Sequence, residues 1–529
     1  MCGIYLSLTQ NKADRTAWSR FIKSMHRGSD ASSFFTKMID RGEDVDVQVR
    51  CDYGFHYLKI NDLTESGNQP FTDADGSFCI CNGEIYNHME LRQQFLTDYV
   101  FKSNSDCEVL LPLFKKLGKD FIHQLDGEFS IVLYSATDRS FFIARDPVGV
   151  RPLYIADAEG CLEVSSELKS VHLATVRHFP PGTYLTISEI QSKLNFATYF
   201  KLQPQTRHSI SFEQAAKDLR HKLERAVQKR LASKVQIGAL LSGGIDSSGV
   251  AALAAMHSKE RLQTFTIMIE ELPNEDAKYG RLVAEYIGSI HHEVKVSLKE
   301  IFEEIDPLIY IIETYNLEVI PNHILVYLIG KYVRENTNVK VLLDGTGPDE
   351  ELGGYWFFRE AVSDIDFENE TIKQLNDIHK TELLAERGLA YFGLEARYPY
   401  LDRELVRYLL DLPIDYKLLS SEHTNGEQIE KFILRQALKD LLPTDVQFRK
   451  KLGMTHGAGK NFEYLFDQEI KRRLGVSDDK KDVMSHARII GLETYYKTVF
   501  FDRYPFALNF DCSVVPSAWR QNDALAMWR

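Results

Sequence analysis

The segment QIGALLSGGIDSSGVAALAAM, residues 236–256, decides the fold of the larger part of this 529-residue chain. Its apolar start, Gln236–Leu241, predicts a strand, and Ser247–Met256 predicts a helix. Between them lies the loop Ser242-Gly243-Gly244-Ile245-Asp246-Ser247-Ser248. Glycines let a backbone approach a ligand closely, and serines at a helix N-terminus supply donors to an anion. The segment therefore predicts either a phosphate-binding loop, with Asp246 as a magnesium ligand, or a plain strand–helix turn.

The same alternation of strands and helices continues along the chain. An amphipathic helix is expected at Phe212–Ser233, before the first strand. The later strands are expected at Thr264–Ile269, His292–Val296 and Val339–Leu343, and the later helices at Ala277–Ile287 and Ile324–Val333. Strands that alternate with helices predict a parallel sheet covered on both faces.

A second glycine-rich, acidic loop follows the expected strand Val339–Leu343. It reads Asp344-Gly345-Thr346-Gly347-Pro348-Asp349-Glu350. Ligands bind at the carboxyl ends of parallel strands. Two such loops at two strand ends predict one nucleotide–metal site, in which Asp246 and Asp349 share the metal.

Residues 1–200 have a different pattern, with short β-type runs separated by turn residues. The runs are Ile4–Leu8, Phe78–Cys81, Phe129–Tyr134 and Ser140–Ala144, and helices are expected at Met89–Phe95 and Cys107–Leu117. Residues 201–212 are polar and have the composition of a linker. We therefore expect a first domain at 2–200, a linker at 201–212 and a second domain at 213–529.

Composition excludes several classes of protein. The net charge of −13 argues against binding nucleic acid, which needs a basic surface. The seven cysteines show no paired CxxC spacing, so neither a zinc site nor a disulfide framework is expected. No apolar stretch reaches the roughly 18 residues of a transmembrane helix, and the N-terminal segment lacks the basic region of a signal peptide. These features predict a cytoplasmic protein with no membrane partner.

Residue 2 is a cysteine, in the sequence Met1-Cys2-Gly3-Ile4. If Met1 were removed, the thiol of Cys2 and a free α-amino group would belong to one residue. The reference pKa of an α-amino group, about 7.7–8.0, suits it to act as a base for the thiol. The alternative is an incidental small apolar residue. The N-terminal motif alone therefore does not assign a catalytic role to Cys2, and the rest of the chain has to support that assignment.

A series of short motifs runs in order along nearly the whole chain. In the first domain they are His26-Arg27-Gly28, Gln69-Pro70, Asn82-Gly83-Glu84-Ile85-Tyr86-Asn87, Ser105-Asp106-Cys107-Glu108, Arg145-Asp146 and Pro152-Leu153-Tyr154. In the second they are the Ser242–Ser248 loop, Gly345–Tyr355, Glu395-Ala396-Arg397, and Arg449 with Lys451. Together with the Met-Cys-Gly-Ile start, they resemble the motifs of glutamine-dependent asparagine synthetases.

For the first domain, the resemblance implies an αββα domain of the N-terminal-nucleophile hydrolase fold, α+β in class, that hydrolyses glutamine. Cys2 would attack the amide, and the Asn82 side chain with the Gly83 N–H would form the oxyanion hole. A hairpin turn is the alternative for Asn82-Gly83. The residues that bind glutamine would be Glu84 and Asp106, which would hold its α-amino group, together with Ile60 and Tyr57.

For the second domain, the resemblance implies a parallel-sheet α/β fold like that of adenine-nucleotide α-hydrolases and ATP pyrophosphatases. Aspartate would be adenylated on its β-carboxylate by ATP with Mg²⁺, and ammonia from the first domain would displace AMP. An internal passage is implied, because ammonia in water is protonated and no longer nucleophilic. The ATP-binding residues would be Leu240, Ser242, Gly243, Gly244, Asp246, Ser247, Ser248, Ile267, Asp344, Gly345 and Lys451, and the metal ligands Asp246 and Asp349.

One departure from the family pattern concerns the donor glutamine. Tyr57 stands where the family has an arginine for the glutamine carboxylate. A phenol cannot form the bidentate, charge-assisted pair of a guanidinium. His56, Lys59 or Arg27 would have to replace that cation.

Three further departures cluster where the acceptor is expected. Thr346, with Asp344 beside it, replaces an acidic residue and a serine; Pro321-Asn322-His323 replaces Arg-Ala-Ser; and Glu386 replaces an aspartate. The residues near the acceptor or intermediate would be Thr346, Glu386 and Arg397.

Three functions remain open from the sequence. The first is a glutamine-hydrolysing asparagine synthetase, with a homodimer as a candidate assembly. The second is a related amidotransferase that acts on a different carboxylate. The third is a binding or regulatory protein with a degenerate core. The retained Cys2, Asn82, Asp246, Asp349 and Lys451 argue against the third.

Overall fold

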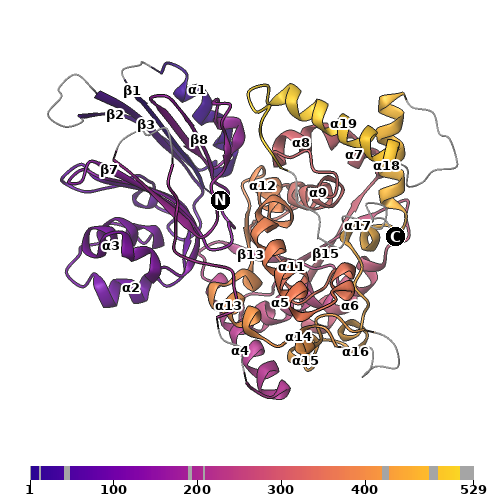
Figure 1. Ribbon diagram of the computed structural model, residues 1–529. Coiled ribbons are helices and arrows are strands. Elements are labelled where there is room, and N and C mark those ends of the chain that lie inside the picture. Colours follow the sequence, from indigo (N-terminus) through magenta and orange to yellow (C-terminus); the bar gives the residue numbers. More distant parts are fainter. Residues whose placement is uncertain are drawn as a thin grey trace.

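The computed structural model describes residues 2–10, 14–40, 48–188, 194–205, 209–419, 428–475 and 486–512. Two antiparallel sheets form the first part of the molecule and one parallel sheet forms the second, which lies beside it (Figure 1). This arrangement confirms the predicted order of an α+β part followed by an α/β part.

The first part is a sandwich of two six-stranded antiparallel sheets. Ile4, Leu6 and Phe55 of one sheet pack against Ile80 and Val132 of the other to form its core. One sheet has the order β10 (Arg177–His178), β8 (Tyr154–Ala158), β9 (Cys161–Ser165), β1 (Gly3–Gln10), β3 (Gln48–Tyr57) and β2 (Ala31–Asp40). The other has the order β12 (Ala197–Thr198), β11 (Thr183–Ile187), β7 (Ser140–Arg145), β6 (Gly127–Ser135), β5 (Phe78–Ile85) and β4 (Phe71–Thr72).

Helices cover the outer face of each sheet of this sandwich, which completes the predicted αββα layers. Over the first sheet lie α1 (Ala17–Phe21) and the 3₁₀ helix η1 (Ile22–Gly28). A β-carbon at Gly54 would lie 2.6 Å from the Phe21 ring, so glycine is required for this close packing. Over the second sheet lie α2 (His88–Phe95), η3 (Asp106–Val109) and α3 (Leu110–Leu117), followed by η4 (Gly118–Gln124).

The second part contains the five-stranded sheet with the order β15 (Ile290–Val296), β14 (Gln263–Ile269), β13 (Gln236–Leu240), β16 (Val339–Leu343) and β17 (Glu395–Arg397). Every neighbouring pair in it is parallel. The strands predicted from the alternating pattern are present, and β13 and β16, which precede the two glycine-rich loops, are direct neighbours.

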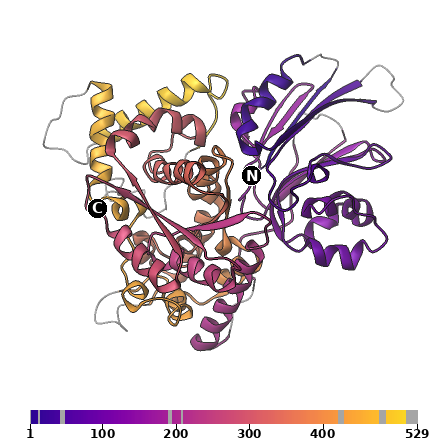
Figure 2. The same cartoon turned by 180° about the vertical axis from the view of Figure 1, so that it is seen from behind.

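Helices cover both faces of the parallel sheet (Figures 1 and 2). One face carries α4 (Phe212–Arg230), α5 (Ile245–His257), α6 (Glu275–Ile287), α13 (Arg403–Asp411) and α15 (Phe432–Ala437). The other carries α8 (Ile305–Ile312), α9 (Ile320–Asn336), α12 (Ala385–Ala390), α18 (Phe462–Leu474) and α19 (His486–Arg503). Shorter helices are α7 (Leu298–Glu303), α10 (Pro348–Glu351), α11 (Asp364–Asp377), α14 (Ile414–Lys417), α16 (Thr444–Gln447) and α17 (Met454–Ala458).

Helix α4 begins at the predicted residue because the Ser211 side chain accepts a hydrogen bond from the Gln214 N–H and caps it. In the described part of the chain, no helix is both long and apolar enough to cross a membrane.

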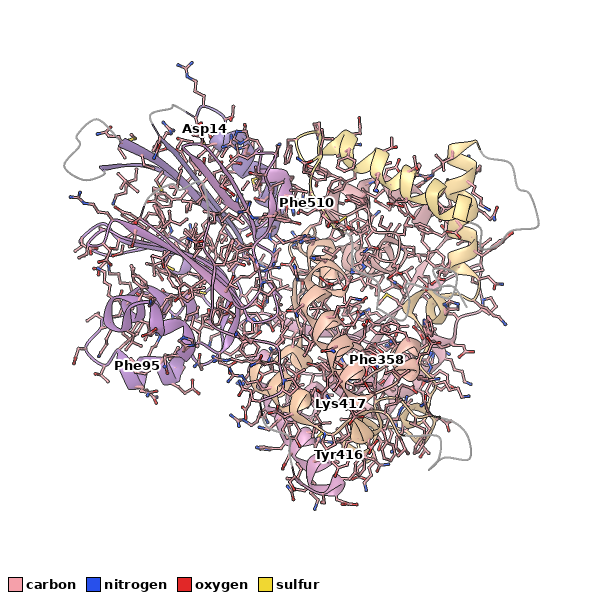
Figure 3. The ribbon with its side chains drawn as sticks, viewed as in Figure 1. Asp14, Phe95, Phe358, Tyr416, Lys417 and Phe510 are labelled. Carbon is pink, nitrogen blue, oxygen red and sulfur yellow. The ribbon has the colours of Figure 1, made fainter. Side chains whose placement is uncertain are left out.

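The two parts share one apolar core. A single buried cluster runs from Leu110 and Phe129 of the first part to Ile324 and Leu389 of the second. The C-terminal segment extends this contact, because the Phe510 ring lies 5.9 Å from Tyr154 and 5.2 Å from His178 of the sandwich (Figure 3).

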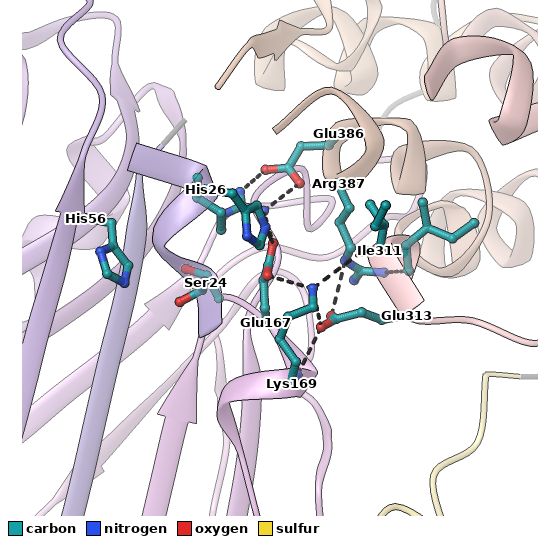
Figure 4. Close-up of polar contacts among 12 residues, drawn as sticks. Ser24, His26, His56, Glu167, Lys169, Ile311, Glu313, Glu386 and Arg387 are labelled. Atoms are coloured by element: carbon teal, nitrogen blue, oxygen red, sulfur yellow. Dashed lines mark hydrogen bonds and ion pairs between the residues drawn. The ribbon is translucent and has the colours of Figure 1, made fainter. Parts of the chain in front are cut away.

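Buried charges also cross the boundary between the parts (Figure 4). Arg27 of η1 donates to Glu167 at 3.1 Å and to Glu386 of α12 at 3.2 Å, and all three side chains are fully buried. Beside them, Lys169 of the sandwich pairs with Glu313 of the second part at 3.0 Å. These pairs fix the orientation of α12 against η1.

A second charge network surrounds β17, the edge strand of the parallel sheet. Arg230 of α4 donates to Glu128 of β6 at 3.0 Å and to Asp402 at 3.1 Å. Arg151 of the sandwich donates to Glu128 at 3.0 Å and to the Ala396 carbonyl of β17 at 3.1 Å. Arg397 of β17 in turn lies 3.3 Å from Glu84 of β5. The two parts are therefore held together by charge as well as by apolar contact.

Replacing Glu386 with glutamine tests the outer network. Glu386→Gln removes a charge that neutralises the buried Arg27, and breaking a buried ion pair costs about 3–5 kcal/mol. We expect a fall of several degrees in the melting temperature, measured by calorimetry. Glu303→Gln is the control, because this exposed carboxylate is 3.9 Å from Lys299 and should contribute almost nothing. Equal melting temperatures for the two variants would show that Arg27 does not need Glu386.

Candidate active sites

Cys2 directly precedes β1 and packs where the two parts meet. Its side chain lies against a small apolar cluster of Leu58, Ile60 and Val341, the last from β16 of the parallel sheet. The Sγ donates weakly to the Leu58 carbonyl at 4.0 Å, and Arg27 Nε donates to the Cys2 carbonyl at 3.0 Å. Burial raises the pKa of the thiol to about 12, with smaller contributions from the charges of Glu395 and Glu84. The thiol therefore needs a base to become a nucleophile.

Asn82 and Gly83 lie within β5, so the alternative of a hairpin turn is wrong. Asn82 pairs with Ser130 of β6 in the ladder, and its side chain is fully buried. Neither its amide nitrogen nor its oxygen has a hydrogen-bond partner in the described structure. An unpartnered buried amide is costly, which suits a donor reserved for a ligand. A β-carbon at Gly83 would lie 2.1 Å from the Glu128 carbonyl, so only glycine fits there.

Glu84 and Asp106, the predicted ligands of the glutamine amino group, lie close enough to share one donor. The Asn61 amide nitrogen donates to Glu84 and, at 3.2 Å, to Asp106. Burial, with the neighbouring Asp106 charge, raises the pKa of Glu84 well above its usual value. Asp106 also accepts from the Ile85 N–H at 2.6 Å. Asn61 was not predicted, since an asparagine after a strand is ordinarily a turn residue.

Tyr57 ends β3 and is almost fully buried. Its hydroxyl donates to the Asp62 carbonyl and so holds the segment that carries Ile60 and Asn61. The three cations expected to replace the missing arginine have other partners. Their partners are Ser32 and the Phe21 carbonyl for His56, Glu65 for Lys59, and Glu167 and Glu386 for Arg27.

The loop predicted to bind phosphate, which we call the phosphate-binding loop, joins β13 to α5. Gly243 has a φ of +73°, and a β-carbon there would lie 2.4 Å from that of Tyr279, so glycine is required twice over. The Ser242 and Ser247 hydroxyls lie 3.0 Å apart, and the Gly244 N–H donates to Ser242 at 3.3 Å. Arg449, 207 residues away, donates to the Ser242 carbonyl at 2.9 Å. The Ser248 hydroxyl is buried with no hydrogen-bond partner among the described residues.

The loop after β16 touches the phosphate-binding loop, as predicted from the strand ends. A β-carbon at Gly345 would lie 2.7 Å from the Ser247 nitrogen. Leu240 and Ile267 are buried near the ends of β13 and β14, beneath this contact. Within the loop, Thr346 donates to Asp344 through its N–H at 2.9 Å and its hydroxyl at 2.8 Å. Burial raises the pKa of Asp344.

Asp246 and Asp349 meet at one ammonium group. Lys431 Nζ binds Asp246 Oδ2 and lies 2.7 Å from Asp349 Oδ1, while Lys451 lies 2.7 Å from Asp349 Oδ2. Burial opposes ionisation of Asp349, but the two lysines hold its pKa below the usual range. Lys431 was not predicted. It stands 185 residues from Asp246, and nothing local distinguishes it from an exposed lysine at a helix start.

The residues present fit a magnesium ion. The Oδ1 atom of Asp246 is buried and has no hydrogen-bond partner in the described structure, and Asp349 Oδ1 beside it is held by Lys431. In that same part of the chain, no three His, Cys, Asp or Glu side chains form a metal cluster. Magnesium is commonly bound by one or two carboxylates together with substrate phosphates, so two carboxylates beside a phosphate-binding loop suffice.

The residues predicted near the acceptor divide into two groups. Thr346 lies in the loop after β16. Glu386 and Arg397 lie instead in the ion pairs between the parts, and their contact with the acceptor stays a prediction. In the segment 321–323, the other departure from the family pattern, the ring of His323 on α9 lies 2.8 Å from the Val319 carbonyl and 3.2 Å from the Glu382 carbonyl.

The sandwich, its cysteine and the phosphate-binding loop together define a two-part, glutamine-dependent amidotransferase. Residues 1–180 match the model of the glutamine amidotransferase domain, and residues 218–370 and 363–491 match that of asparagine synthase. The chain is 33% identical to "Asparagine synthetase [glutamine-hydrolyzing]" of Brassica oleracea and 35% identical to "Asparagine synthetase [glutamine-hydrolyzing] 1" of Arabidopsis thaliana, in each case over 95% of this chain and 86% of the relative. The chain belongs to the family of glutamine-hydrolysing asparagine synthetases.

Two solved structures are more distantly similar. One is the glutamine phosphoribosylpyrophosphate amidotransferase from B. subtilis complexed with ADP and GMP, with a TM-score of 0.30, 19% identity, and coverage of 48% of this chain and 64% of that chain. The other is the NH3-dependent NAD synthetase from Campylobacter jejuni in complex with nitrate, with a TM-score of 0.24, 14% identity, and coverage of 55% and 96%.

Glu350, next to Asp349, generates a prediction about pH. Burial, with the charges of Glu382 and Asp349, raises the pKa of Glu350 to about 8. The folded protein therefore keeps a proton that the unfolded chain loses near pH 4.5. Its contribution to stability is fully present below that pH and is lost as the pH rises toward 8.

In the nucleotide-free protein, Glu350→Gln should make the free energy of unfolding fall less steeply between pH 5.5 and 7.5, by at most about 1.4 kcal/mol per pH unit. Urea denaturation at several pH values measures this slope, with Glu303→Gln as the exposed control. If Glu350→Gln and wild type have the same slope, Glu350 is ionised in the folded protein.

Proposed function

We propose that this chain is a glutamine-hydrolysing asparagine synthetase. It adenylates the β-carboxylate of aspartate with ATP and amidates the product with ammonia released from glutamine at Cys2. The observation that carries the proposal is the contact between Cys2 and the cluster that contains Val341. Val341 lies on β16, whose carboxyl end bears the Asp344–Glu350 loop. The nucleophile of one reaction thus packs on the strand that supports the other.

In the first reaction, the Cys2 thiolate attacks the γ-amide carbon of glutamine. The α-amino group of a processed N-terminal Cys2 acts as the base that takes the thiol proton and passes it to the leaving ammonia. The unpartnered amide of Asn82 and the N–H of Gly83 stabilise the oxyanion. Water then cleaves the thioester and releases glutamate.

In the second reaction, the Ser242–Ser248 loop and the N-terminus of α5 hold the phosphates of ATP. Asp246 and Asp349 would hold Mg²⁺, which offsets the charge of the departing pyrophosphate. Lys451 and Lys431 supply positive charge at the same point. Adenylation replaces a poor leaving group with AMP, and ammonia then displaces it.

Ammonia must cross between the two sites without meeting water. The apolar contacts of Cys2 with Leu58, Ile60 and Val341 provide surroundings in which ammonia stays unprotonated. The ion pairs of Arg27 and Arg397 keep this boundary closed.

Cys2→Ala tests the separation of the two reactions. This variant should lose glutamine-driven asparagine formation and keep ammonia-driven formation, because only the first reaction uses the thiol. Asparagine and glutamate are quantified with each nitrogen source. Equal loss of both activities would refute two separable sites, and unchanged glutamine turnover would refute Cys2 as the nucleophile.

Asp246→Asn and Asp349→Asn test the metal site. Each variant lacks one carboxylate charge, so the rate of ATP-to-AMP conversion should fall at least about a hundredfold and should respond less to magnesium. Glutaminase activity should remain. Asp445→Asn is the matched control, because this residue, the second of α16, is exposed. Normal pyrophosphate release by either variant removes that residue from the metal site.

The acceptor is tested directly with a panel of carboxylic acids. Pyrophosphate release that depends on aspartate supports the proposal. Release that depends on another acid, and not on aspartate, supports the alternative of a related amidotransferase. The substitutions at Thr346, Asp344 and 321–323 make this panel necessary.

A further inference from the structure

We propose that the donor pocket recognises glutamine by its α-ammonium group and supplies no cation for its α-carboxylate, so that it also cleaves the γ-amide of glutamine whose α-carboxyl is blocked. This inference rests on the proposed glutaminase activity. The additional substrate class is the free-amine glutaminyl amide, as at the N-terminus of a peptide.

The ammonium side of the pocket is well provided. Glu84 and Asp106 both bind the Asn61 amide nitrogen and have only small exposed fractions. An ammonium group has three donors, so it can take the place of this one N–H₂ group between the two carboxylates. The charge-assisted bonds that result are stronger than the neutral ones they replace.

On the carboxylate side, the three cations that the sequence offers each have other partners. Lys59 points to Glu65, and its backbone N–H binds Asp30. His56 lies on the far side of its strand, stacked on the Phe21 ring at 3.8 Å. Arg27 is neutralised by two buried carboxylates.

Two further arginines near the pocket have structural partners as well. Arg397 approaches Glu84 but is neutralised by Glu395 at 2.7 Å and donates to the carbonyls of Arg230 and Ala232. Arg92 donates to the Ser105 carbonyl at 2.8 Å and lies over the Phe101 ring at 3.8 Å. The guanidinium groups of Arg27, Arg92 and Arg397 are therefore all engaged by groups of the protein itself.

Tyr57 stands at the sequence position where the family pattern has an arginine. Its hydroxyl is already given to the Asp62 carbonyl, and a β-carbon at the adjacent Gly67 would lie 2.3 Å from that hydroxyl. The phenol therefore closes this wall of the pocket and offers no charge. A neutral α-amide meets such a wall at least as well as a carboxylate does.

The electrostatic consequence decides the direction of the preference. Asp106 brings a negative charge to the pocket beside Glu84, and Arg397 does not offset this charge because Glu395 neutralises that guanidinium. A free α-carboxylate adds negative charge to these surroundings, whereas a blocked one does not. Removing that charge should leave kcat/KM unchanged or raise it.

The chemistry of the additional substrate is the same as that of glutamine. A bond forms between the Cys2 sulfur and the γ-carbon, the bond to the amide nitrogen breaks, and the nitrogen leaves as ammonia with the proton from the thiol. Water cleaves the thioester and restores the thiol. The product is glutamate with its α-carboxyl still blocked.

The test compares three donors with the full-length protein. They are L-glutamine, its α-N-methylamide, from which ammonia can come only from the γ-amide, and N-acetyl-L-glutamine. Ammonia release by Cys2→Ala is subtracted as the background. We expect the N-methylamide to have a kcat/KM of at least one third that of glutamine, and N-acetyl-L-glutamine to lose a hundredfold or more.

A preference of more than threefold for free glutamine over its N-methylamide would overturn the proposal. So would efficient turnover of N-acetyl-L-glutamine, because the ammonium group would then be dispensable. If wild type releases no more ammonia from any donor than Cys2→Ala does, the proposed function itself has failed. The two failures are therefore distinguishable.

Tyr57→Arg identifies the residue that sets the preference. A charge-assisted pair should lower the KM for free glutamine by one to two orders of magnitude and shift the ratio of the two donors at least tenfold toward glutamine. Trp18→Arg, which adds the same charge at an exposed site on α1, should leave the ratio unchanged. Ammonia-driven synthesis checks the folding of each variant. An unchanged ratio in a folded Tyr57→Arg would overturn the assignment to Tyr57, and if this variant does not fold, the wild-type donor ratio still decides the proposal.

Discussion

The buried charge of Arg27 is the constraint on which the relation between the two domains depends. Glu167 of its own domain and Glu386 of the other neutralise it, and its Nε fixes the carbonyl of Cys2. A buried charge that loses its partner destabilises a protein by several kcal/mol. The first domain can therefore hold its nucleophile in place only while the second supplies Glu386. The position of the reactive thiol and the docking of the two domains therefore depend on the same ion pairs of Arg27.

Local patterns predicted the parts of the molecule that depend on local order. The alternation from Gln236 to Leu343 predicted the parallel sheet, and the two glycine-rich loops met because parallel neighbours bring their carboxyl ends together. Asn82-Gly83 lies within β5 and does not form a hairpin turn, and its role in an oxyanion hole stays a prediction. Helix α4 begins at the predicted Phe212, where Ser211 caps it, whereas other helix bounds differ from the prediction by a few residues.

The remaining site residues could not be predicted, because each gains its role from a distant partner. Lys431 binds an aspartate 185 residues away, and Asn61 joins two carboxylates from different elements. Glu386 was expected near the acceptor, yet its visible partner is Arg27, 359 residues earlier. Such pairs follow from how the domains dock, and a single sequence carries no periodic signal of docking. The partners of the cations near Tyr57 could not be predicted for the same reason, and compensation by one of them stays untested by these contacts.

The charge network around Arg230 and Arg397 limits how the gene can be divided during evolution. The polar segment 201–212 invites division of the chain into two proteins. Division there would leave Arg230 and Arg397 in one product and their partners Glu128 and Glu84 in the other. Each product would expose the charges and the apolar surface that the other now covers, and would be prone to aggregate before the two met. Selection should therefore retain the two domains in a single reading frame.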